Sequence, residues 1–386
     1  MDFGLTDEQR LLIDSVRRFI KEELQPLEDE IERNDDIDSK AARAVYEKSK
    51  SLGLYALNMP EEFGGGGLSA VDSMLCEEQF GHTTDILVRR AFGDVYEALL
   101  ACRGEQIDRW LRPAVSGERI CGFAITEPGA GSDAQNIRTT ASQVEGSWVL
   151  NGTKHFISDA EASDCFIVSA RTGPSEISLF LVDKGLPGFT VGRRQRMMGL
   201  RGTTHNELVF DNVKLETVAL LGERGAGFKA AMSMLGRVRL SLIGARAVGR
   251  ASHVLEMMTE YAAMRQQFGK PLGEFQLIQE MIADSVIEIN ATRLMVLRAA
   301  WMLDQGLDAR GWISMVKVQA SEVLNRVVDR GVQVFGGMGY CQEMPLERYF
   351  RDARIFRIFD GTSEIHRVVI ARTALKQGPA LFDLHR

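Results

Sequence analysis

The stretch GFAITEPGAGSD, residues 122–133, joins a short apolar run to a turn that contains a proline and two glycines. The apolar run is typical of a strand. A glycine-rich turn exposes backbone N–H groups to an anionic or polar ring system, and Thr126 and Ser132 add hydroxyl groups. The alternative is an ordinary Pro-Gly turn that ends in a helix cap at Ser132 or Asp133, and the stretch by itself favours this alternative.

Around this stretch, over residues 121–224, short apolar runs alternate with turn residues, a pattern typical of strands. The dipeptide Asn151-Gly152 separates residues 148–150 from residues 154–157. Because Asn and Gly accept the positive φ angles of a type I′ turn, the dipeptide predicts a hairpin between those two runs. We therefore expect an antiparallel sheet domain over residues 121–224.

The segments on either side have helical patterns. Residues 1–120 begin with a capping box of Thr6 and Gln9, in which each side chain can reach a free N–H of the first turn. In residues 225–386, an apolar stripe that starts at Leu277 and ends at Trp301 is long enough for bundle helices. The predicted fold class is α+β, with a helical N-terminal domain, an antiparallel β middle domain and a C-terminal four-helix bundle.

The composition excludes several classes of protein. Of the 386 residues, 45% are hydrophobic and 26% are charged, as in globular domains. The net charge, 46 − 53 = −7, argues against a dominant nucleic-acid function. Five scattered cysteines predict neither a disulfide framework nor a structural zinc site, and they favour a reducing compartment. No apolar run is long enough for a membrane span, and the polar, acidic start predicts no signal or transit peptide. We expect a cytoplasmic protein.

A second glycine-rich segment, QVFGGMGY, covers residues 333–340. It follows an apolar helical run, so its glycines fit either a helix C-cap or a backbone nest near a nucleotide. Because it follows a helix and not a strand, it is not a Rossmann fingerprint.

Asp360 lies in a third glycine-rich segment, residues 358–366. Apolar side chains precede it at positions 356, 358 and 359, and a carboxylate in such surroundings is partly desolvated. Desolvation raises the pKa of a carboxylate and suits it to act as a base. The alternative, about equally favoured by the motif alone, is that Asp360 N-caps the next helix.

The remaining charged residues indicate no separate site. Arg351, Arg354 and Arg357 recur every three residues, which is typical of a solvated face or of salt bridges, and Arg89-Arg90 are expected to pair with nearby acids. The six histidines lack metal-ligand spacing, so no metal is expected. The sequence has no G-x-S-x-G elbow or Walker loop, so hydrolase and nucleotidase functions have no support.

Taken together and in this order, the segments resemble the acyl-CoA dehydrogenase family of flavoproteins. Residues 124–133 match the first family signature, and residues 265–272, followed by Phe275-Gln276, resemble the R-x-x-F-G segment. The second signature matches at Gln333, Gly336, Gly337, Gly339, Tyr340, Glu343, Arg348 and Asp352. The resemblance covers essentially the whole chain.

The resemblance implies FAD between the β domain and the C-terminal helices, and a homotetramer in which a neighbouring subunit completes each site. The family positions that line the flavin or the thioester correspond to Phe123, Ile125, Thr126, Ser132, Phe156, Ile157 and Ser158. The pyrophosphate and adenine are expected to be held across the subunit boundary by Arg265, Phe268, Gln276, Gln333, Gly336 and Gly337. Thr362 and Glu364 are expected to contact the cofactor. The substrate is expected to contact Ser132, Arg239 and Gly361.

Two residues depart from the family pattern. The family's catalytic residue before Gly-Thr is usually Glu, whereas Asp360 is one methylene shorter and reaches roughly 1.5 Å less far. Some branches place the glutamate beside Arg239, but Val238 occupies that position here, so Asp360 remains the expected base. Aspartate at this place occurs in relatives acting on alicyclic acyl-CoAs and in nitroalkane oxidases. Glu364 stands where Gln is common, which could alter contacts to the flavin or the adenine.

The activity implied by the resemblance is α,β-dehydrogenation of an acyl-CoA thioester, alicyclic or branched. Asp360 removes the α-proton while a hydride leaves the β-carbon for the flavin, and the electrons then pass to an electron-transfer flavoprotein. Three alternatives stay open. They are a flavin oxidase acting on a nitroalkane or an acyl-CoA, a desaturase of carrier-protein-bound acyl groups, and a non-catalytic protein that binds acyl-CoA or FAD.

Overall fold

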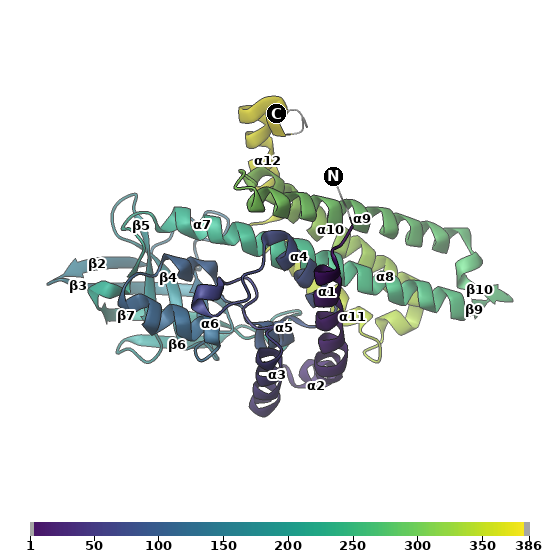
Figure 1. Cartoon of the computed structure of the whole chain (residues 1–386), viewed down its shortest axis with the longest axis horizontal. Helices are drawn as coiled ribbons and strands as arrows, with labels where there is room; N and C mark the ends of the chain where they lie inside the picture. The colour runs from purple at the N-terminus through teal and green to yellow at the C-terminus, as the bar shows by residue number, and fades with distance from the viewer. Residues whose placement is uncertain (1–3, 382–386) are drawn as a thin grey trace.

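The computed structural model describes residues 4–381, and their elements follow the predicted order of helices, sheet and helices (Figure 1). In Figure 1 the sheet lies at one end of the molecule, the long C-terminal helices extend to the other end, and the N-terminal helices lie between them. Residues 1–3 and 382–386, the outer ends of the two expected helical domains, lie outside the described residues. The expectation that the N-terminus carries no signal or transit peptide therefore falls partly on residues outside the described range.

The N-terminal helices begin at the predicted capping box. The Gln9 N–H donates to Thr6 Oγ1 at 3.2 Å, and the Thr6 N–H donates to Gln9 Oε1 at 3.0 Å. The α-helices are α1 (Asp7–Phe19), α2 (Glu28–Asn34), α3 (Ser39–Ser51), α4 (Ala70–Phe80), α5 (Asp85–Phe92) and α6 (Arg112–Ser116). Two π-helical segments, η1 (Ile20–Leu24) and η5 (Ile107–Leu111), and three short 3₁₀ helices, η2 (Gln25–Leu27), η3 (Glu61–Phe63) and η4 (Glu97–Ala101), join them.

The middle segment forms one mixed sheet in the strand order β6-β7-β3-β2-β4-β5-β8, with β1 paired to β4. The strands are β1 (Cys121–Ala124), β2 (Thr140–Val144), β3 (Ser147–Ser158), β4 (Cys165–Arg171), β5 (Ile177–Asp183), β6 (Phe189–Arg194), β7 (His205–Leu215) and β8 (Leu220–Leu221). Most neighbours are antiparallel, as predicted, but β1 and β2 each run parallel to β4. Alternating apolar runs do not distinguish the two directions, because they report which residues are buried and not strand order.

The predicted hairpin at Asn151-Gly152 is wrong, because β3 runs straight through both residues. The turn lies earlier, at Glu145 and Gly146, whose φ angles are 49° and 79°, and it joins β2 to β3. Gly152 lies instead at an irregularity in the pairing of β3 with β7. Its φ is 145°, and a Cβ there would lie 2.5 Å from Thr139 Oγ1. Glycine at this position therefore allows Thr139 to lie close to β3, and it does not form a turn.

In the C-terminal segment, α10 lies at the centre and contacts α8, α9, α11 and α12. A π-helical segment, η7 (Arg239–Ala245), joins α7 (Gly227–Val238) to α8 (Arg246–Met264). The other elements are β9 (Gln266–Gln267), β10 (Lys270–Pro271), η8 (Leu272–Glu274), α9 (Gln276–Asp304), α10 (Arg310–Phe335), η9 (Gly336–Tyr340), α11 (Leu346–Ile355), α12 (Ser363–Gln377) and η10 (Gly378–Leu381). The largest apolar core of the chain lies among these helices and includes Ile243, Val316 and Val327.

Close contacts and ion pairs join the N-terminal helices to the bundle. A Cβ at Gly249 of α8 would lie 1.7 Å from Glu78 O, so only glycine lets α4 approach α8 this closely. The Arg293 guanidinium lies 2.8 Å from the Glu78 carboxylate, and Arg348 pairs with Glu28 in the interior. The N-terminal helices are therefore fixed against the bundle that forms the opposite side of the site.

The structure also answers three smaller expectations. All five cysteines are free thiols. Arg351 pairs with Glu347 at 2.8 Å and Arg357 with Glu322 at 2.7 Å, as the spacing of these arginines predicted. Among residues 4–381, every helix is too short or too polar to cross a membrane.

Candidate active site

A cavity of about 600 Å³ lies where the N-terminal helices, the sheet and the C-terminal helices meet. It collects residues that are far apart in the sequence. Those predicted as contacts to flavin or substrate, or as the base, that line it are Phe123, Ile125, Thr126, Ser132, Phe156, Ile157, Ser158, Asp360, Gly361 and Thr362.

A buried ion pair holds the sheet side of the cavity in place. The Lys154 Nζ, which is fully buried in β3, donates to Glu127 Oε1 at 2.8 Å and to Ile125 O at 3.1 Å. This pair fixes the turn that carries Thr126 against β3. Burial lowers the pKa of Lys154 to about 8, although Glu127 opposes the shift. We did not predict either residue as part of the site, and the only available signal was a lysine within a strand-like run.

The alternative interpretation of residues 126–133 as a turn ending in a helix cap is wrong. After Asp133 the chain passes through turns to β2 without forming a helix. The Glu127 carboxylate accepts hydrogen bonds from the Arg138 N–H at 2.6 Å and the Thr139 N–H at 3.0 Å. A buried side chain therefore closes this loop where a helix cap was considered.

Phe156 brings a partly exposed aromatic side chain, stacked on His155, to the cavity. Its backbone φ is 58°, in the left-handed region that non-glycine residues rarely adopt, and such strain is often found at functional sites. The side chain remains 48% exposed although it lines the cavity. Thr126 and Ser158 bring hydroxyl groups to the same cavity, so the sheet side combines aromatic surface with a few polar groups.

Asp360 faces this cavity from the loop between α11 and α12. Its φ is 53°, and its backbone carbonyl accepts hydrogen bonds from Arg239 Nε at 2.8 Å and His366 Nε2 at 3.1 Å. Within residues 4–381 its carboxylate oxygens form no hydrogen bond. The alternative of Asp360 as an N-cap is wrong, because Thr362 caps α12 by accepting the Ile365 N–H at 3.2 Å.

Burial raises the pKa of Asp360, and the nearby cations Arg239 and Lys317 oppose the rise. Arg239 begins the π-helical segment η7, and such bulges are frequent at functional sites. Lys317 is fully buried in α10, and its Nζ has no hydrogen-bond partner among the described residues. Burial also lowers the pKa of Lys317, to about 8. The sequence offered a signal for Lys317 that we did not use, a lysine between Val316 and Val318 in a helix.

The third side of the cavity comes from α5 and the residues that follow it. Asp85, Arg89, Asp94 and Tyr96 line it, together with Arg246 of α8. The predicted pairing of Arg89 and Arg90 with acids is confirmed. Arg89 Nε lies 2.7 Å from Asp85 Oδ2, and Arg90 binds both oxygens of Asp159 at 2.6 and 2.7 Å.

The other predicted cofactor residues do not line this cavity. They are Arg265, Phe268, Gln276, Gln333, Gly336, Gly337 and Glu364. The first three belong to the β9–β10 region, which Figure 1 shows at the end of the molecule away from the sheet. Phe268 is 93% exposed. A single chain therefore does not bring these residues to the cavity. Arg239 contacts Asp360 through a hydrogen bond without lining the cavity itself.

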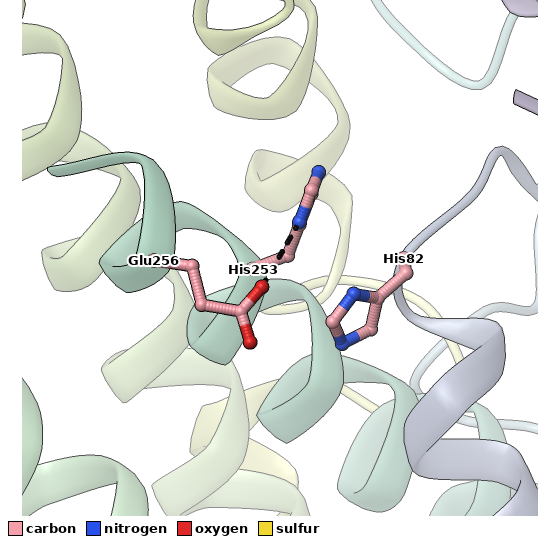
Figure 2. Close-up of side chains that lie close together, drawn as sticks. All are labelled: His82, His253 and Glu256. Carbon is pink, nitrogen blue, oxygen red and sulfur yellow. Dashed lines mark ion pairs between the residues drawn. The ribbon is translucent and has the colours of Figure 1, made fainter. Parts of the chain in front are cut away.

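Figure 2 shows a separate group formed by His82, His253 and Glu256. Their potential ligand atoms lie within 4.8 Å of one another, and His253 Nδ1 lies 3.6 Å from Glu256 Oε2. Burial lowers the pKa of His82 to about 3, and the neighbouring His253 is the second cause of this shift. The His82 imidazole is therefore neutral. Arg17 and Arg250 lower this pKa further. Two cations this close oppose a divalent ion, so we do not assign the group to metal binding.

An α–β–α chain whose parts meet at a cavity with a partly exposed aromatic ring and a partly buried carboxylate is typical of a flavin-dependent dehydrogenase. Family models describe the acyl-CoA dehydrogenase N-terminal domain, middle domain and C-terminal domain, and they match residues 6–118, 122–213 and 225–375. The chain therefore belongs to the acyl-CoA dehydrogenase family.

Three similar proteins illustrate this membership. An acryloyl-CoA reductase (NADH) of Anaerotignum propionicum is 37% identical, with 98% of this chain and 97% of the relative covered. A cyclohexane-1-carbonyl-CoA dehydrogenase of Geobacter metallireducens is 35% identical, with 97% and 99% covered. The solved structure of an acyl-CoA dehydrogenase from Bacillus anthracis complexed with FAD has a TM-score of 0.89 and 31% identity, with 98% of this chain and 68% of that chain covered.

FAD is the cofactor of this family, and the cavity suits it. The Phe156 ring stacks on His155, and its exposed part offers apolar contact to a planar ring system. The hydroxyls of Thr126 and Ser158 offer hydrogen bonds to the polar edge of such a ring system. The enzyme is an oxidoreductase that acts on CH–CH groups.

Proposed function

We propose that the chain catalyses the α,β-dehydrogenation of an acyl-CoA thioester, with Asp360 as the base. One observation carries this proposal. Asp360 faces the cavity with a carboxylate that accepts no hydrogen bond within residues 4–381, opposite a sheet wall suited to a flavin. A base must be free to accept a proton from a substrate within hydrogen-bond reach, and this carboxylate is free.

The residues around Asp360 hold the base in place. Arg239 and His366 bind its backbone carbonyl, so the loop is fixed while the carboxylate stays available. Arg239 and Lys317 oppose the rise in its pKa that burial causes, which favours the ionised form that a base requires. When bound, FAD supplies the acceptor for the hydride that leaves the β-carbon. Phe123, Ile125, Ile157 and Thr362 would complete its contacts, and Ser132 and Gly361 would bind the thioester.

The shorter reach of Asp360 supports a bulky α-carbon, alicyclic or branched. Retracting the carboxylate by about one C–C bond leaves room for a ring or a branch beside it. The name of the Geobacter metallireducens relative, a cyclohexane-1-carbonyl-CoA dehydrogenase, is consistent with this shape. We infer from the resemblance to the family that the electrons pass to an electron-transfer flavoprotein.

Flavin reduction is expected to slow on acidification. Only the ionised Asp360 can accept the α-proton, so the rate should be constant above its pKa and fall about tenfold per pH unit below it. Because burial raises this pKa, the fall should begin above the ordinary aspartate value of about 3.9. Anaerobic rapid mixing with saturating thioester over a pH series measures the rate of flavin reduction at each pH.

A variant checks the sign of this effect. Lys317 stabilises the Asp360 anion, so Lys317→Met should raise the pKa of Asp360 and move the falling limb to higher pH. A rate that stays constant down to about pH 4 in both proteins would contradict Asp360 as a base with a raised pKa.

We also propose an oligomer in which a neighbouring subunit completes each FAD site. Ile287, Leu294 and Trp301 of α9 recur every seven residues and are 67%, 52% and 42% exposed. Part of the predicted stripe of α9 therefore faces outward, and an apolar face of this kind is typical of an interface. A neighbouring copy that covered it would also explain why Arg265, Phe268 and Gln276 lie away from the cavity of their own chain.

The wild-type protein is expected to be a homotetramer, or at least a dimer, in light scattering. Ile287→Glu combined with Leu294→Glu should produce monomers that retain less FAD, because charges would be buried at the interface. Leu375→Glu on α12 is a matched control, since Leu375 is 88% exposed and lies outside this face. A wild-type monomer with FAD bound would refute the shared site.

A further inference from the structure

The α5 side of the cavity is built from charged groups. Arg89 Nε lies 2.7 Å from Asp85 Oδ2, and its terminal nitrogen pairs with Asp94. Arg246 pairs with Glu77 and lies 3.6 Å from Asp85 Oδ1. Four of these five side chains line the cavity. The fifth, Glu77, lies outside the lining and pairs with Arg246. We call this group the α5 charge cluster.

The α5 charge cluster holds three carboxylates and two guanidiniums, so one negative charge is not balanced within it. Asp85 is ionised: burial opposes its charge, but Arg89 and Arg246 outweigh this effect and hold the pKa of Asp85 at about 2. Asp94 is the open end of the cluster, since its side chain is 31% exposed against 9% for Asp85 and 16% for Glu77. The excess negative charge is therefore presented by Asp94.

Asp94 also lies close to the reaction centre. Arg89, Asp94, Tyr96 and Ser158 line both the site cavity and a second cavity of about 430 Å³, so the two cavities meet at the α5 charge cluster. Asp360 lines the same cavity as Arg89 and Asp94, so the base and the α5 charge cluster face one space.

An acyl group bound at Asp360 would share the cavity with a wall that carries a partly exposed carboxylate. A purely apolar group would remove Asp94 from water and add no partner to Arg89 and Tyr96, which already contact it, and such desolvation is costly. A carboxylate-bearing group would add repulsion. A protonated nitrogen would neutralise the excess charge in surroundings where charge pairing is strong.

We propose that the substrate's acyl group carries a protonated nitrogen, on a ring or a chain, and that Asp94 binds it. This inference rests on the proposed function, because it takes Asp360 as the base that fixes where the acyl group lies. Asp94 would then be a specificity-determining residue on the α5 side of the cavity.

The test compares thioesters that differ by one atom. Piperidine-4-carbonyl-CoA replaces one ring carbon of cyclohexanecarbonyl-CoA by a protonated nitrogen, and 5-aminopentanoyl-CoA does the same for the terminal methyl of hexanoyl-CoA. Dissociation constants are measured for the FAD-bound protein by anaerobic calorimetry, in wild type and in Asp360→Asn, where turnover does not interfere. We expect the nitrogen-bearing member of each pair to bind about tenfold more tightly or better.

Asp94→Asn should remove this preference, whereas Asp183→Asn should keep it. Asp183 is a matched control because it pairs with Arg109 and Arg119 outside the cavity. FAD content and thermal stability show that each variant is folded. Equal or tighter binding of the carbon isosteres by wild type would overturn the inference, and so would an unchanged preference in Asp94→Asn. Because binding is read separately from flavin bleaching, failure of the proposed dehydrogenation would be recognised independently.

Discussion

Asp360→Asn is expected to slow flavin reduction by thioesters by about 10²–10⁴-fold while FAD stays bound. The amide has nearly the shape of the carboxylate but cannot accept the α-proton. The contacts that hold the loop go to the Asp360 backbone carbonyl, from Arg239 and His366, so the substitution leaves them in place. Anaerobic rapid mixing with thioester measures the rate, and the flavin spectrum of the purified variant measures occupancy.

Asp360→Glu is the companion variant, because it restores the missing methylene and keeps the charge. It should retain flavin reduction and move the preference from cyclohexanecarbonyl-CoA and branched thioesters toward butyryl- or octanoyl-CoA. If wild type already reduces fastest with the straight chains and ignores ring and branched thioesters, the inferred substrate shape is wrong and the base assignment survives. If Asp360→Asn reduces the flavin at the wild-type rate, the base assignment itself fails.

Glu127→Gln is expected to destabilise the protein by about 3–5 kcal/mol, the usual cost of removing one partner of a buried ion pair. Lys154 is fully buried, and Glu127 supplies its only carboxylate partner among the described residues. The other hydrogen bonds of Lys154 Nζ go to neutral oxygens of Ile125 and Ser169, at 3.1 Å each. Thermal unfolding should therefore occur at a markedly lower temperature, and FAD should be held less tightly because the turn that carries Thr126 is loosened.

Two further variants separate charge burial from other effects. Adding Lys154→Met to Glu127→Gln should recover much of the loss, since the unpaired charge is then removed. Glu176→Gln serves as the matched control, because Glu176 pairs with Arg224 where both side chains are about half exposed, and such pairs contribute about 0–1 kcal/mol. An unfolding temperature for Glu127→Gln equal to that of Glu176→Gln would contradict the role of the buried pair.

The order of the elements could be predicted from the sequence because periodicity and caps are local properties. The capping box of Thr6 and Gln9 forms as expected. The hairpin at Asn151-Gly152 was wrong because turn dipeptides also suit irregularities within a strand, and the choice depends on which partner approaches. Here Thr139 lies against Gly152, and the turn falls at Glu145 and Gly146.

The base of the candidate site could be proposed from the sequence, but its supporting charges could not. Asp360 is distinguished by its apolar neighbours and its glycine-rich segment, which are local signals. Lys154 and Lys317 depend on burial by distant segments, and lysines in apolar runs are usually interpreted as exposed. The charged wall at Asp94 was missed for a related reason, since the pairing of Arg89 was expected but not its place in the cavity.

Anaerobic titration of the purified wild-type protein with a panel of saturated acyl-CoA thioesters tests the central proposal most directly. The panel includes straight, branched, alicyclic and amine-bearing acyl groups. We expect the flavin absorbance to bleach with at least one of them and one α,β-unsaturated thioester to form per flavin reduced, and we expect the bleaching to be about 10²–10⁴-fold slower in Asp360→Asn. A wild-type protein that holds FAD, binds these thioesters and leaves the flavin oxidised with every one of them would contradict it.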